Sequence, residues 1–165
     1  MFMAVVVALF IGLTVSAEEI IKDRRIQKRE SFLNLSRISY LWSKIIILFT
    51  LSAIQAIMFT LVGNFVLAIH GMTGAYWFAL FSTFCFANML GLNISASFNS
   101  AVTIYILIPI LIIPQLLFSG VMVKFDKLNP AITNQRVVPV VGDAMASRWA
   151  FEALAVKQYR DNEYE

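Results

Sequence analysis

Two long stretches of this 165-residue chain, residues 1–17 and 45–123, contain no Asp, Glu, Lys or Arg. A water-soluble domain built from such stretches would need a charged outer face, and they supply none. Composition agrees, because only 14% of the residues are charged, compared with about a quarter in an ordinary soluble domain. Both stretches are therefore predicted to lie in lipid.

Turn-forming residues divide the apolar stretches into spans. Residues 70–74 contain two glycines and form a short predicted hairpin, and Asn99 and Ser100 mark a second turn. The predicted fold is an all-α integral membrane protein that crosses the bilayer four times. The spans are residues 1–17, 45–69, 75–97 and 102–123.

The first span is short, because 17 residues rising about 1.5 Å each reach only roughly 25 Å. Its end, Val15-Ser16-Ala17, also resembles the small-residue cleavage site of a secretory signal peptide. However, the basic cluster follows the apolar run and does not precede it, which favours a membrane span. A signal peptide remains the alternative.

The segment 18–44 carries seven basic and four acidic residues and holds the whole charge excess of the chain. Its charges are interrupted by isoleucines at a spacing typical of an amphipathic helix, and Tyr40, Trp42 and Lys44 suit the depth of the lipid headgroups. Basic loops stay in the cytoplasm, so the tail 124–165 is predicted to lie outside. Flanking spans explain the basic excess, and no nucleic-acid partner is predicted.

The third span is the most polar, with Asn88, Asn93 and a run of small residues at intervals of four that includes Gly91 and Ser95. Small residues at this interval allow two helices to approach closely. Polar groups in lipid need a partner or water, so helix packing and a translocation path both remain open. Pro109 in the fourth span removes a backbone donor and bends the helix.

The tail is predicted to form one interfacial helix that begins after Asp143, a residue suited to an N-cap. Met145, Trp149, Ala153 and Val156 would share its apolar face.

Three stretches carry a resemblance to a known family. The first runs from Ser16 to Glu30 and closes with Tyr40-Leu41-Trp42-Ser43-Lys44, the second runs from Asn99 through Pro109 to Phe118-Ser119-Gly120, and the third is Ser147-Arg148-Trp149-Ala150-Phe151-Glu152-Ala153-Leu154. Together they resemble the membrane half of a type-2 ATP-binding-cassette (ABC) exporter, particularly the G-subfamily permeases. The resemblance covers nearly the whole chain, with Trp149 where Tyr is more usual.

The resemblance implies that residues 18–30 form a coupling helix that contacts an ATPase domain. The residues implied in coupling are Glu18, Glu19, Lys22, Arg24, Arg25, Arg29 and Glu30, and those of the external motif are Ser147, Trp149 and Glu152. It further implies a second permease copy, a transported substrate that the sequence does not identify, and a location in the plasma (inner) membrane.

The chain also departs from that family. It contains no G-x-x-x-x-G-K-[ST] loop, so ATP and Mg²⁺ are expected on a partner ATPase domain and no cofactor on this chain. The family's first and last membrane helices have no counterpart, and we expect the chain to be an internal piece of a longer permease.

Two other functions were compared with transport. A membrane tether or assembly protein would use the basic helix to dock a cytoplasmic partner without any substrate path. An intramembrane enzyme would need paired acids, a histidine cluster or a serine with a base inside the spans, and the sequence has none of these. No catalytic residue and no metal site is therefore predicted.

Overall fold

The computed structural model describes residues 2–30, 36–67, 72–121 and 140–160. Within these ranges the chain forms seven helices. They are α1 (Phe2–Ala17), α2 (Glu19–Glu30), α3 (Arg37–Leu67), α4 (Thr73–Ser97), α5 (Ala101–Leu117), α6 (Val140–Asp143) and α7 (Ala146–Arg160). The predicted hairpin at 70–74 falls partly outside the described residues, as does His70.

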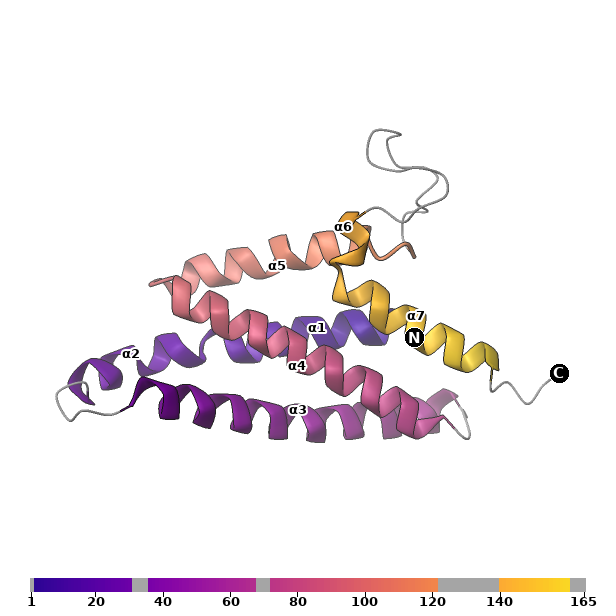
Figure 1. Ribbon diagram of the computed structural model, residues 1–165, viewed down its shortest axis with the longest axis horizontal. Coiled ribbons are helices and arrows are strands. Elements are labelled where there is room, and N and C mark those ends of the chain that lie inside the picture. The colour runs from indigo at the N-terminus through magenta and orange to yellow at the C-terminus, as the bar shows by residue number, and fades with distance from the viewer. Residues whose placement is uncertain (1, 31–35, 68–71, 122–139, 161–165) are drawn as a thin grey trace.

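The long helices α1, α3, α4 and α5 run along the long axis of the molecule, with α2 at one end and α7 toward the opposite end (Figure 1). Helix α4 packs against α1, α3, α2 and α7, and α1 also packs against α5. The core lies between α1, α4 and α5, and its largest fully buried side chains include Leu9, Phe84 and Ile104.

Small residues set the distance between α1 and α4. A Cβ added to Gly12 would lie 2.7 Å from the Cβ of Ala87, and one added to Gly91 would lie 1.9 Å from the Oγ of Ser16. Only glycine allows the two backbones to come this close. The predicted small-residue face of the third span therefore meets a second small-residue face, which the sequence analysis had not identified on α1.

Burial in this bundle combines an apolar core with small polar side chains and an apolar surface. Ser16, Ser52 and Ser95 are fully buried, whereas Phe65 is 90% and Met3 is 73% exposed. A buried hydroxyl can donate to a carbonyl of its own helix, as Ser52 does to Leu48 at 2.8 Å. A surface rich in large apolar side chains is suited to hydrocarbon, which confirms the predicted membrane fold.

Helix α3 differs in one respect from its prediction. It runs without a break from Arg37 to Leu67, so the interfacial residues Tyr40 and Lys44 belong to the same helix as the span and the chain does not turn after them. Its bundle face consists of Leu48, Ser52, Ala56 and Thr60 at intervals of four, all of them buried.

The fourth predicted span is shorter than expected. Helix α5 ends at Leu117, not at residue 123, because the chain turns at residues 118–121 and Gly120 takes a left-handed φ of 78° that favours glycine. Three described stretches are long and apolar enough to cross a membrane, namely Phe2–Arg29, Arg37–Val66 and Thr73–Ser97, and α5 is a shorter apolar helix.

The prediction for the tail was wrong in two details. Asp143 ends α6 and does not cap α7, which begins at Ala146. Ser147 and Leu154 are the buried residues of α7, while Trp149 and Val156 of the predicted apolar face are more than half exposed. In lipid an apolar face need not turn toward protein, so periodicity alone cannot identify the packed side.

Candidate coupling site

Helix α2 is a polar helix attached to the end of α1. Glu19 lies in its first turn and Lys28 and Arg29 in its last, which matches the helix dipole. Just before it, Glu18 pairs with Lys22 at 2.5 Å across one turn. These local preferences favour a helix directly after the apolar α1.

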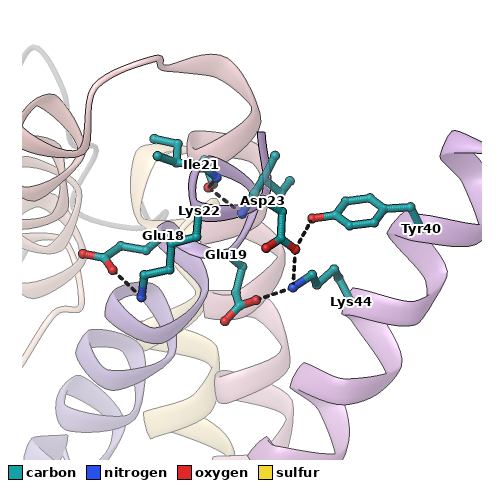
Figure 2. Close-up of polar contacts among 9 residues, drawn as sticks. Glu18, Glu19, Ile21, Lys22, Asp23, Tyr40 and Lys44 are labelled. Atoms are coloured by element: carbon teal, nitrogen blue, oxygen red, sulfur yellow. Dashed lines mark hydrogen bonds and ion pairs between the residues drawn. The ribbon is translucent and has the colours of Figure 1, made fainter. Parts of the chain in front are cut away.

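A partly exposed cluster of polar side chains joins α2 to α3, and Figure 2 shows its members pointing toward one another. The Lys44 Nζ lies 2.7 Å from both Glu19 Oε2 and Asp23 Oδ2, and the Tyr40 hydroxyl donates to Asp23 at 2.9 Å. The hydrogen bond from the Lys44 ammonium holds the pKa of the Asp23 carboxyl below its usual value. One lysine therefore bridges two carboxylates on consecutive turns of α2.

The coupling residues predicted from the sequence do not include Asp23, Tyr40 or Lys44. The sequence feature that points to this cluster is the i, i+4 spacing of Glu19 and Asp23, which places both carboxylates on one face of α2. That spacing shows a shared face, but it does not show which cation the face meets.

A second connection joins α2 to the end of α4. The Oγ of Ser95, a fully buried side chain, accepts hydrogen bonds from the backbone N–H groups of Ile20 at 3.1 Å and Ile21 at 3.2 Å. In the opposite direction, Arg24 donates through Nη2 to the carbonyl of Ala96 at 2.8 Å, with the Ser95 carbonyl 3.5 Å away. Arg24, one of the residues predicted for coupling, therefore points toward the end of α4.

The opposite face of α2 is open. Lys22, Arg25 and Arg29 are exposed, and Ile26 between them is 53% exposed. Arg25 and Arg29 form no ion pair among the residues that the structure describes. The side chain of Glu30 lies outside the described part. Residues 22, 25, 26 and 29 are called the outer face of α2 below.

The two asparagines of the third span lie in different environments. Asn88 is buried, and its Nδ2 donates to Ser52 Oγ at 2.6 Å and contacts the Leu48 carbonyl at 3.4 Å, so it lies in the packing of α4 on α3. Asn93 is exposed and donates to Met89 of its own helix. Pro109 on α5 is exposed as well.

The predicted external motif lies at the other end of the bundle. Ser147 is fully buried, and its Oγ donates to the Gln115 carbonyl at 2.6 Å while its N–H donates to Gln115 Oε1 at 3.2 Å. Trp149 donates through Nε1 to the Asp143 carbonyl. Glu152 is exposed and lies 3.4 Å from Arg148, which also pairs with Asp143. The motif therefore fastens α7 to α5 and α6.

Comparison with known proteins gives one finding on identity. A family model described as ABC-2 type transporter matches residues 1–157. No curated protein and no solved structure matches the chain. The family match covers nearly the full length of the chain and includes α1 to α6 and most of α7. The chain belongs to the ABC-2 type transporter family and is an integral membrane permease domain of the kind that pairs with an ABC ATPase.

Proposed function

We propose that this chain forms the substrate pathway of an ATP-driven exporter in the plasma (inner) membrane, and that the outer face of α2 rests on the ATPase domain. ATP and Mg²⁺ bind on that partner domain, and its closure moves the membrane helices through α2. The transported substrate is not identified by these residues.

One observation carries the proposal: one face of α2 is bonded to the bundle and the opposite face is exposed. Its inner face is fixed to α3 through Lys44 and to α4 through Ser95, while its outer face presents Arg25, Ile26 and Arg29. A helix that is fixed on one side and open on the other can bind a separate domain and transmit its movement. A segment that served only to set orientation would need no such attachment.

A second copy of the chain completes the pathway in this proposal. Helix α5 exposes Val102, Tyr105, Ile106, Ile110 and Ile113, and α1 exposes Met3 and Phe10 beside it. These faces are available to lipid or to another helix of the same kind. Substrate would pass between two copies, with the ATPase domains below them.

Charge reversal on the outer face tests the proposal. Arg25→Glu together with Arg29→Glu should prevent co-purification of the ABC ATPase domain with the permease from detergent-solubilised membranes, because both side chains are exposed and neither supports the bundle. The control is Arg160→Glu, a single charge reversal at an exposed position of α7, and it should leave co-purification unchanged.

ATP hydrolysis by the reconstituted complex separates transport from tethering. We expect permease binding to change the hydrolysis rate of the ATPase domain, and the double variant to lose that change. Binding without any change of rate would favour the membrane tether. Unaltered binding by the double variant would refute docking through the outer face of α2.

A further inference from the structure

The contacts between α2 and α4 join the start of α2 to the end of α4. Each helix supplies hydrogen-bond partners for backbone groups at the end of the other. The first turn of a helix leaves backbone N–H groups without partners, and the last turn leaves carbonyls without partners. Ser95 near the end of α4 accepts the N–H groups of Ile20 and Ile21 in the first turn of α2. Arg24 of α2 donates to the Ala96 carbonyl in the last turn of α4.

These bonds are costly to break separately. Loss of Ser95 Oγ would leave two backbone donors unpaired in a buried position, and loss of Arg24 would remove a cation from the negative end of the α4 dipole. Because each helix supplies a group that the other needs, the two ends are stable together. We call the four contacts of Ser95 and Arg24 with α2 and α4 the reciprocal cap.

We propose that Ser95 and Arg24 are the positioning residues through which movement of α2 enters α4 and then α5. The inference rests on the proposed function, in which a partner ATPase moves α2. It adds the route of that movement, which the function by itself does not specify.

Packing supports this route. Helix α1 continues into α2 after Glu18 and is packed closely on α4 at Gly12 and Gly91, so both α1 and the start of α2 contact α4. Helix α4 ends at Ser97 and α5 begins at Ala101, so only residues 98–100 separate them. A displacement of the end of α4 therefore reaches α5 through three residues.

The connection to α3 is of another kind. Lys44 and Tyr40 contact α2 through side-chain atoms alone. In the ion pair between Lys44 and Asp23, the side chains are 19% and 27% exposed. Partly exposed ion pairs are weak and adapt to small shifts, because water can replace them. Helix α3 is therefore attached to α2 less firmly than α4 is, and it supplies the second point from which movement of α5 is measured.

Distance measurement by pulsed electron paramagnetic resonance in the complete permease–ATPase complex tests the route. Spin labels at Ile46→Cys on α3 and Val102→Cys on α5, both exposed positions, are introduced with Cys85 replaced by Ser. Adding ATP, Mg²⁺ and vanadate should change the label distance in the otherwise unaltered chain. Ser95→Ala and Arg24→Ala should each abolish that change while co-purification of the ATPase domain stays intact.

The controls are Ser97→Ala, an exposed serine bonded only to its own helix, and Arg37→Ala, an exposed arginine; both should keep the distance change. If Ser95→Ala is not recovered from membranes, Arg24→Ala decides alone, because the Arg24 side chain is only partly buried. A full distance change in Arg24→Ala, or none in the unaltered chain, overturns the route. Failure of docking in the Arg25/Arg29 test overturns the proposed function instead.

Discussion

Single residues with almost no side chain determine how the membrane helices of this protein approach one another. Gly91 faces Ser16 and the Leu13 carbonyl of α1, and a Cβ there would lie 3.0 Å from that carbonyl oxygen. Backbone atoms cannot move aside as a flexible side chain can. Gly63 on α3, by contrast, has no neighbour within 4 Å of its Cβ position.

Gly91→Ala should therefore destabilise the bundle by about 1–3 kcal/mol, the usual cost of overpacking a core. Gly63→Ala, in the middle of α3, should be neutral or stabilising by about 0.5–1 kcal/mol, because alanine loses less backbone freedom. The free energy of unfolding in mixed detergent–SDS micelles measures both. Equal effects at the two positions would contradict the close approach of α1 and α4.

Polar residues show how far the sequence could predict the candidate site. The interval of Ala87, Gly91 and Ser95 correctly indicated one small-residue face. It did not indicate that Ser95 accepts backbone N–H groups from a helix 74 and 75 residues away in sequence. Such a bond depends on the relative placement of two helix ends, which local periodicity does not contain.

At the level of elements, the attachments of α7 and α2 are built from helix ends. Ser147 near the start of α7 donates to the Gln115 carbonyl in the last turn of α5, where the helix itself provides no donor. The hydropathy pattern predicted the long helices because lipid selects for apolar length. It failed for α7, whose packed side is marked by Ser147 and Leu154 and not by its most apolar side chains.

Ser147→Ala should loosen α7 from α5, because it removes the donor to the partly buried Gln115 carbonyl, at a cost of about 0.5–1.5 kcal/mol, the net contribution of a typical hydrogen bond. Limited proteolysis of purified permease should then cleave within 140–160 faster than in the unaltered chain. Ser82→Ala on α4, an exposed serine bonded only within its own helix, serves as the control and should leave the rate unchanged. An unchanged rate in Ser147→Ala would show that other contacts hold α7.

The whole molecule has its charge clusters at opposite ends. Helix α2 lies at one end of the bundle and the Asp143–Arg148–Glu152 cluster lies on α6 and α7 toward the other (Figure 1). The basic excess of residues 18–44 predicts that the α2 end is cytoplasmic. The structure adds that the exposed cations of α2 point away from the bundle, where a cytoplasmic domain could reach them.

Single-cysteine labelling of intact cells tests this orientation. In a Cys85→Ser background, a membrane-impermeant maleimide should react with Gln158→Cys on α7 without permeabilisation. It should react with Arg25→Cys on α2 only after the membrane is opened; both positions are exposed. Labelling at position 25 from outside would reverse the topology and remove the basis for docking on α2.

The apolar surface of this bundle has a consequence for comparing it with its relatives. Hydrocarbon accepts almost any bulky aliphatic or aromatic group, so we expect positions such as Phe65, Met58 and Ile54 on the outside of α3 to vary among relatives. A larger side chain at Gly12 or Gly91 would collide with the facing helix. We therefore expect relatives of this protein to agree more closely at these two glycines than on their lipid-facing surface.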